Sequence, residues 1–183
     1  MKNLIIFEVV CLVLLGLGFA RRRNRHAKEI AELIKLPPVT TDFSTPEGAI
    51  LCLEAARANK DLEAAMGCCD FVTHARLWIR ESGYTPEEGE GQMLLEMTKD
   101  MEKVFRKHFE EFGWGIPAAR CYFPERTPYG EGLVLVSTVK VGPDRSLFRQ
   151  RILTSQTATG WRVVTPLVET PVGWRVTPRL AKP

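Results

Sequence analysis

The hydrophobic pattern of this 183-residue chain changes its period near residue 113, and that change constrains the fold more than any other feature. Before it, apolar residues recur at helical spacing in four segments, residues 44–60, 62–66, 71–80 and 92–112. After it, apolar and polar residues alternate as in strands, in residues 119–123, 133–141, 146–154 and 161–165. Helices followed by strands that pair in chain order predict an α+β fold.

Two of the predicted helices carry specific expectations. The first is expected to use Ser44 as its N-terminal cap, with Pro46 in the first turn and Glu47 completing a capping box. The longest, residues 92–112, has one apolar face, and His108 falls on it. A lone histidine on such a face predicts a core residue rather than a catalytic one.

A short motif occurs twice near the C-terminus. Residues 160–166 read GWRVVTP and residues 173–178 read GWRVTP. The first copy is expected to be the closing strand of the antiparallel sheet, with Trp161 packed against the helices. The second copy is surrounded by prolines, which favours an edge strand or a covering arm. Two copies are too few for a repeat fold, which needs at least three units.

The N-terminus reads as a membrane anchor. Residues 4–20 are apolar except for Glu8, and an arginine cluster follows directly, in residues 21–25. A secretory signal would instead carry its positive charge in front and a small-residue cleavage site behind. We therefore expect an uncleaved single-pass helix in the inner (cytoplasmic) membrane. The positive-inside rule then predicts that the rest of the chain faces the cytoplasm.

The expected organisation has four parts. Residues 1–25 form the anchor with its arginine cluster, and residues 26–43 form a short helix and a linker interrupted by adjacent prolines. Residues 44–167 form the α+β domain, and residues 168–183 form a C-terminal arm.

The distribution of charge argues against nucleic acid as a partner. The formal net charge is +3 at pH 7, but six of the 25 Lys and Arg residues precede residue 29, where Glu8 is the only acid among 22. The remainder therefore holds 19 basic and 21 acidic residues. A near-neutral domain lacks the basic surface that binds phosphate backbones.

The five cysteines show no disulfide framework. Cys68 and Cys69 are adjacent, which disfavours a bond between them, and buried thiols in a reducing compartment are expected. Cys68, Cys69 and His74 are the residues of metal-ligating type that lie close together in sequence, but a C-x-x-C pair is missing. Neither a metal nor another cofactor is expected.

One pair has spacing suited to acid–base chemistry. Asp70 and His74 lie four residues apart in a predicted helix, so their side chains can meet on one face. No second acid and no oxyanion donor can be assigned to them, and the fingerprints of serine hydrolases, P-loop proteins and dinucleotide-binding proteins are absent. We expect a protein that is not an enzyme.

Two features are candidates for binding a partner. Residues 81–91 form an acidic, glycine-rich segment whose Glu87, Glu88 and Glu90 could steer a basic protein. Trp174, in the second motif copy, is the tryptophan most expected to be exposed. The alternatives are a solvated linker for the segment and core packing for the tryptophans.

The stretch TPEGAILCLEAARANKDLEAAMGCCDF, residues 45–71, together with the closing GWRV, resembles the nuclear-transport-factor-2-like superfamily. Within it, the chain is most similar to the bacterial immunity-protein branch, over residues 45–167. The resemblance implies a cone-shaped α+β fold, with N-terminal helices packed on a curved antiparallel sheet.

The resemblance also implies a function. It suggests a membrane-tethered immunity-like protein that binds and neutralises a cognate bacterial toxin. A small-molecule-binding or enzymatic cone, of isomerase or cyclase type, is the alternative, because this fold supports many activities. A structural component of a secretion assembly is a third, and it would face away from the cytoplasm.

Overall fold

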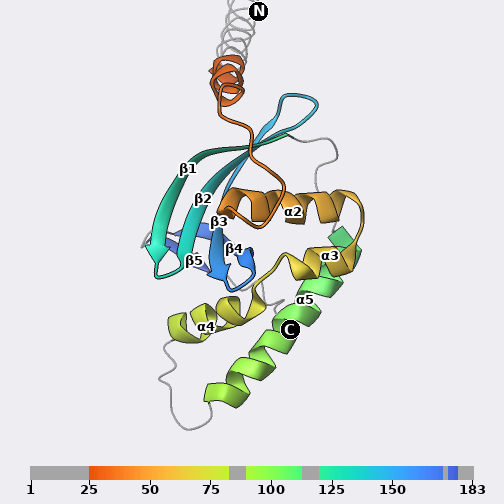
Figure 1. Ribbon diagram of the computed structural model, residues 1–183, viewed down its shortest axis with the longest axis vertical. Helices are drawn as coiled ribbons and strands as arrows, with labels where there is room; N and C mark the ends of the chain where they lie inside the picture. The colour runs from red at the N-terminus through yellow and green to blue at the C-terminus, as the bar shows by residue number, and fades with distance from the viewer. Residues whose placement is uncertain (1–24, 83–89, 113–119, 171–172, 177–183) are drawn as a thin grey trace, which may run out of the picture. The chain divides into compact units, whose positions relative to one another are not determined.

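The computed structural model describes residues 25–82, 90–112, 120–170 and 173–176. The chain divides into two compact units, residues 1–37 and residues 38–183. In the first unit, residues 25–33 form a helix. The second unit holds the remaining elements, namely α2 (Pro46–Ala58), α3 (Leu62–Gly67), α4 (Phe71–Glu81), α5 (Glu90–Phe112), β1 (Arg120–Gly130), β2 (Leu133–Val141), β3 (Leu147–Thr157), β4 (Gly160–Thr170) and β5 (Gly173–Val176) (Figure 1).

The predicted α+β order of helices followed by an antiparallel sheet is confirmed. The five strands lie in the order β1-β2-β3-β4-β5, each antiparallel to the next, and β1 to β3 curve along their length (Figure 1). Neighbours in sequence are thus neighbours in the sheet. The arrangement is the one implied by the resemblance, with N-terminal helices packed on a curved antiparallel sheet.

Polar side chains cap the starts of three helices. Thr45 caps α2 by accepting a hydrogen bond from the Gly48 N–H at 3.0 Å. Asp61 and Asp70 cap α3 and α4 in the same way. The predicted cap at Ser44 is therefore wrong by one residue, because the Ser44 hydroxyl instead donates to the Asp42 carboxylate.

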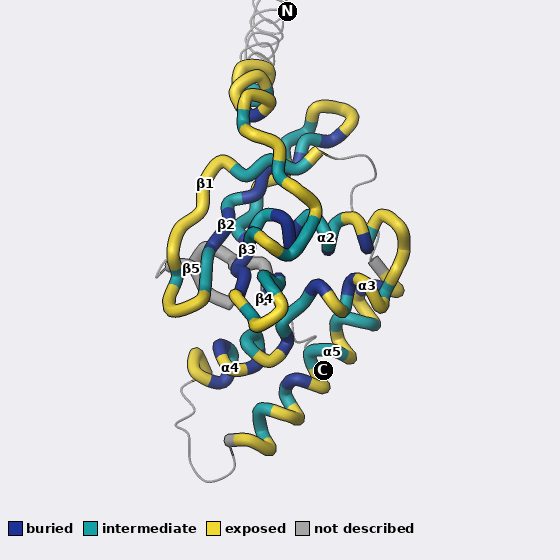
Figure 2. Tube along the Cα trace, viewed as in Figure 1, coloured by how far each residue is buried: buried dark blue, intermediate teal, exposed yellow. Residues whose placement is uncertain are grey.

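The sheet is packed on both faces. On one face, Val136, Ile152 and Val163 form the main core with α2, α3 and Phe109 of α5. The residues next to them in sequence point to the opposite face, where Leu135, Leu153 and Val164 pack on Leu77 of α4. Most residues of β2 are accordingly buried, and four consecutive residues of β3, residues 152–155, are buried too (Figure 2).

The strand bounds differ from the predicted ones at both edges of the sheet. β1 is longer than residues 119–123 because an edge strand can include prolines, and its register shifts between Tyr122 and Glu125, around Pro124. At the other end β4 continues to Thr170, past the predicted domain end at residue 167. The second motif copy forms β5, an edge strand as expected, so β5 and not the first copy closes the sheet.

The predicted position of His108 on the buried face of the long helix is wrong. Phe109 is buried and Phe105 is half-buried against the core, whereas Val104 and His108 are exposed. The buried face of α5 is therefore displaced by about one residue, roughly 100° around the helix, from the face that the sequence predicted. The reason is that α5 packs on α3 and α4.

Candidate functional site

Asp70 and His74 lie at the first turn of α4, where Asp70 is the N-cap. One carboxylate oxygen, Oδ1, accepts from the Thr73 N–H at 2.9 Å. The other, Oδ2, accepts from the Ser155 hydroxyl of β3 at 2.6 Å. Both oxygens therefore have structural partners, and together they join the start of α4 to the sheet.

The backbone before α4 is fixed to the same part of the sheet. The Asp70 N–H donates to the Val163 carbonyl, and the Val163 N–H donates to the Cys68 carbonyl, each at 2.8 Å. Residues 68–70 thus add a short parallel bridge beside β4. This bridge and the carboxylate bond to Ser155 leave Asp70 little freedom to move.

His74 lies half-buried beside this turn as a neutral ring. Burial lowers its pKa from the ordinary 6.5 to about 4, against the opposing effect of the Asp70 charge. Its Nε2 atom is buried and has no hydrogen-bond partner among the described residues. In the same part of the chain, no side-chain hydrogen bond joins Asp70 to His74. The structure brings the two predicted residues together without orienting the imidazole for proton transfer.

Ser155 was not identified from the sequence, although it completes the polar contacts of Asp70. It is 4% exposed, so the carboxylate–hydroxyl pair is closed to a substrate. Its place directly after the buried residues 152–154 of β3 was the signal that could have revealed a buried hydroxyl in need of a partner. The pair joins α4 to β3.

The described cysteines are free thiols with raised pKa values. Burial is the main cause at each of them, and it brings the pKa to about 11 at Cys68 and Cys121 and about 12 at Cys69. The pKa of Cys52 is also raised. These thiols stay protonated at neutral pH, which makes them poor nucleophiles. Over the described residues, no group of three His, Cys, Asp or Glu side chains is placed to hold a metal ion.

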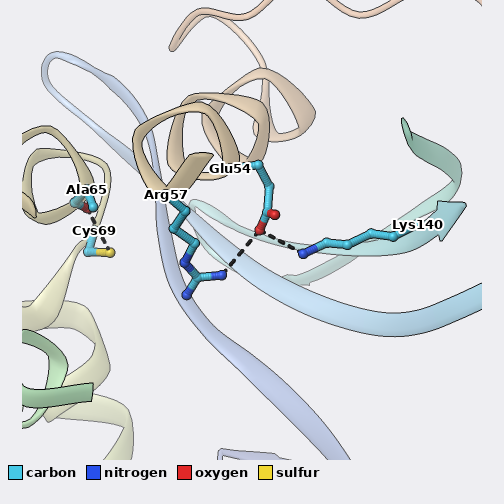
Figure 3. A network of polar contacts seen from close by, with 5 residues as sticks. All are labelled: Glu54, Arg57, Ala65, Cys69 and Lys140. Atoms are coloured by element: carbon cyan, nitrogen blue, oxygen red, sulfur yellow. Dashed lines mark hydrogen bonds and ion pairs between the residues drawn. The ribbon is translucent and has the colours of Figure 1, made fainter. Parts of the chain in front are cut away.

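A second polar cluster lies between α2 and the sheet, and sequence reasoning missed it. Glu54 of α2 contacts Lys140 of β2 at 2.8 Å and Arg57 of α2 at 3.2 Å, both through Oε1 (Figure 3). The Glu54 and Lys140 side chains are only 16% and 10% exposed. A single lysine inside the otherwise apolar or small-residue strand LVLVSTVKV was the available signal.

The predicted binding residues lie largely outside what the structure describes. Glu87 and Glu88 fall outside the described residues, and Glu90 is the first residue of α5, with its side chain outside them. Trp174 lies in β5 opposite Glu169, and its side chain is likewise outside. Among the described residues of the second unit, the large apolar side chains that are exposed are Val72, Leu95, Val104 and Phe148.

The proposed anchor, residues 4–20, also lies outside the described residues. Among the helices that the structure does describe, none combines the length and the apolar character needed to cross a membrane.

The structure was also compared with known proteins. No protein-family model matches the sequence, and no curated protein does. The structure is similar to the crystal structure of a Campylobacter jejuni protein described as an NTF2-like transpeptidase. The two are 11% identical, the likeness covers 66% of this chain and 98% of the other, and the TM-score is 0.37.

Proposed function

We propose that this protein is a membrane-tethered binding domain of the immunity type, which neutralises a cognate bacterial toxin by contact and not by catalysis. The observation that supports it is the state of Asp70. Its carboxylate oxygens are occupied by Thr73 and Ser155, and the nearby His74 is neutral and without an orienting partner in the described structure. The pair best suited to catalysis therefore has a structural role instead.

The region around α4 and α5 is where we expect the partner to bind. Val72 on α4 and Leu95 and Val104 on α5 are 42%, 48% and 46% exposed. The acidic residues 81–91 connect the two helices and carry Glu87, Glu88 and Glu90. Exposed apolar groups on two helices that an acidic segment joins suit a basic protein partner, because the charges speed association and the apolar groups slow dissociation.

The test is co-expression of the toxin encoded beside this gene with variants of the full chain. Replacing Glu87, Glu88 and Glu90 together by Lys is expected to weaken protection and to slow association, with a larger effect at low salt than at high salt. The matched control makes the same charge change at three exposed glutamates outside α4 and α5, Glu32, Glu125 and Glu131, and is expected to keep protection. Full protection by the first triple variant would exclude the acidic segment as the contact.

The catalytic alternative is tested in the same assay. His74→Gln is expected to leave protection nearly unchanged, because a binding surface tolerates loss of a half-buried neutral ring that makes no hydrogen bond through Nε2. An enzyme would lose orders of magnitude in rate. Loss of protection in a folded His74→Gln variant would overturn the proposal and favour an enzymatic cone.

The secretion alternative depends on topology. We propose that the domain faces the cytoplasm, as the arginine cluster after residue 20 suggests. An alkaline phosphatase fusion after Pro183 is then expected to be inactive, and a cytoplasmic reporter at the same place active. The reverse result would favour a component of a secretion assembly.

A further inference from the structure

The hairpin that joins β2 to β3 ends in a turn closed by hydrogen bonds. The Gly142 N–H donates to the Ser146 carbonyl, and the Arg145 N–H donates to the Gly142 carbonyl, each at 2.9 Å. The Asp144 carboxylate accepts from both the N–H and the hydroxyl of Ser146, at 3.0 and 2.6 Å. The turn is therefore well defined, and it lies at the end of the sheet opposite to α4 (Figure 1).

Arg145 occupies a backbone conformation in this turn that normally favours glycine. Its φ is +64°, in the left-handed region, where residues other than glycine are uncommon. Its side chain is exposed, so the fold gains little from it. An arginine at a position that suits glycine points to a use for its charge outside the fold.

Two more exposed arginines lie at the same end of the sheet. Arg149 of β3 stands opposite Val139 of β2, and Arg120 of β1 stands opposite Val141 of β2. Because Val139 and Val141 are two residues apart in β2, both arginines lie on one face of the sheet. Together with the arginine of the turn they place three exposed positive charges at this end, against the single carboxylate of the turn.

Apolar side chains accompany these charges. Phe148 is the second residue of β3 and is 48% exposed, although its ring is large and apolar. Leu147 and Val141 pair with each other beside the turn and are half-buried. Arginine next to exposed aromatic and aliphatic groups is typical of segments that lie in the headgroup layer of a membrane. There the guanidinium binds phosphate and the apolar group enters the layer.

The size of this surface favours a membrane over a protein as the partner. A hairpin end offers only a few side chains, whereas a stable protein interface takes about 20 to 30 residues on each side. A membrane contact can be small if the chain is already tethered. Residues 21–37, which join the proposed anchor to the second unit, span at most roughly 60 Å. Such a tether makes a weak contact effective, because it raises the local concentration of the hairpin at the membrane.

We propose that the β2–β3 hairpin end binds the anionic phospholipid surface of the membrane to which the chain is tethered, through Arg120, Arg145 and Arg149, with Phe148 entering the headgroup layer. This proposal rests on the membrane tether of the proposed function and does not require the toxin contact. Each basic residue near an anionic surface favours the contact by about fivefold. The contact directs the opposite end of the sheet, where α4 packs, away from the membrane and towards a cytoplasmic partner.

The experiment reconstitutes the full chain in nanodiscs of phosphatidylcholine alone and of equal parts phosphatidylcholine and phosphatidylglycerol. Hydroxyl-radical footprinting read by mass spectrometry measures the oxidation of Phe148. Oxidation is expected to be at least about 3-fold slower in the anionic discs, and added salt should remove the difference by screening the attraction. Leu95, which is also 48% exposed, is the internal control and should be oxidised equally in both.

Arg145→Gly is the most informative single variant, because glycine suits a φ of +64° and the fold should keep its stability. It is expected to weaken the membrane contact by about fivefold, measured as a lower salt concentration at which Phe148 loses its protection. Lys60→Gly is the matched control, since Lys60 is also exposed and has φ +60°, but lies between α2 and α3. Combining Arg145→Gly with Arg120→Gln and Arg149→Gln should abolish protection.

Each outcome bears on the proposal. Equal oxidation of Phe148 in the two kinds of disc, with the chain present in both, would overturn the lipid contact, leave the tether standing and favour an acidic protein as the partner of this surface. Failure of the chain to isolate with either kind of disc would overturn the tether and this proposal with it. Protection that persists in the folded triple variant, or that Lys60→Gly weakens as much as Arg145→Gly, would also overturn it.

Discussion

The two GWRV copies begin their strands in the same way and have different surroundings. In each, a threonine pairs with the glycine three residues later, Thr157 with Gly160 and Thr170 with Gly173, and the strand then returns antiparallel to the previous one. Each GWRV copy therefore begins the second strand of a β-hairpin. The two copies differ in the residues that surround them in the fold.

The first copy is held by segments distant in sequence. The Trp161 N–H donates to the Phe43 carbonyl at 2.8 Å, and the Arg162 guanidinium lies 4.0 Å from the centre of the Phe43 ring. Val163 binds the turn at residues 68–70 through both of its backbone groups. This copy therefore connects the segment before α2 and the start of α4 to the sheet.

The second copy lies at the edge of the sheet. Glu169 and Val168 of β4 pair with Trp174 and Arg175 of β5, and the strand order ends there. The same sequence, GWRV, therefore contacts distant segments of the fold in β4 and forms the edge strand of the sheet in β5. This difference predicts that equal substitutions have unequal effects.

The largest difference is expected at the glycines. Gly160 has φ +111°, and a Cβ there would lie 2.5 Å from the Phe43 carbonyl oxygen. Gly160→Ala is therefore expected to lower the free energy of unfolding by about 4 kcal/mol, from backbone strain and overpacking together. Gly173→Ala, in an edge strand, is expected to change it by less than about 1 kcal/mol.

Urea denaturation of the full chain in detergent measures both. Gly67→Ala is a control for a glycine with open space, since nothing lies within 4 Å of a Cβ built there. Equal losses at Gly160 and Gly173 would remove the distinction between the copies.

The sequence predicted the order of elements better than their contacts. Strand β2 was placed at its observed bounds, because alternation and the following turn Gly142-Pro143-Asp144 define it locally. The predicted strand at residues 119–123 ends before Pro124, whereas β1 runs on through Pro124 and Pro128 to Gly130. Only the position of β1 at the edge of the sheet makes those prolines acceptable, and that position depends on tertiary pairing.

The same limit applies to the candidate site. The spacing of Asp70 and His74 placed both residues at one turn of α4, but the side-chain bond it suggested is replaced by one to Ser155, 85 residues from Asp70. Likewise, the Glu54–Lys140 contact joins a helix to a strand far along the chain. Periodicity reports which face a residue takes and cannot report which distant residue meets it.

The free energy of unfolding is also expected to depend on pH through His74, which lies near the first copy. His74 sits next to the turn that Val163 holds, and its pKa in the folded protein is about 4, below the ordinary 6.5. Above pH 6.5 the ring is neutral in both states and adds no pH dependence. Between pH 6.5 and 4 the unfolded chain binds a proton that the folded one does not, so stability falls by up to about 3 kcal/mol.

The measurement is the free energy of unfolding from pH 7 to pH 4 for the parent chain and for His74→Gln. The variant is expected to lose this part of the acid sensitivity, whereas His108→Gln, at an exposed position, should retain it. If His74→Gln follows the parent curve, the ring is not held neutral by burial.

The smallest difference in stability between the two copies is expected when Arg162 or Arg175 is replaced. Arg162→Met removes the contact with the Phe43 ring and the hydrogen bond to the Thr159 hydroxyl at 3.1 Å. The expected loss is about 1 kcal/mol, because a partly exposed cation–π contact contributes little more. Arg175→Met in the second copy should change stability by less than about 0.5 kcal/mol.

Thiol reactivity gives a sharper measurement of the same residue. The Arg162 charge lowers the pKa values of Cys52 and Cys68, which burial otherwise raises. Arg162→Met should therefore raise these two pKa values further and slow alkylation of Cys52 and Cys68 at pH 9, while Cys121, influenced instead by Glu54 and Lys140, keeps its rate. Equal slowing in Arg175→Met would mean that the second arginine shares this environment and that the two copies are less distinct than their strands indicate.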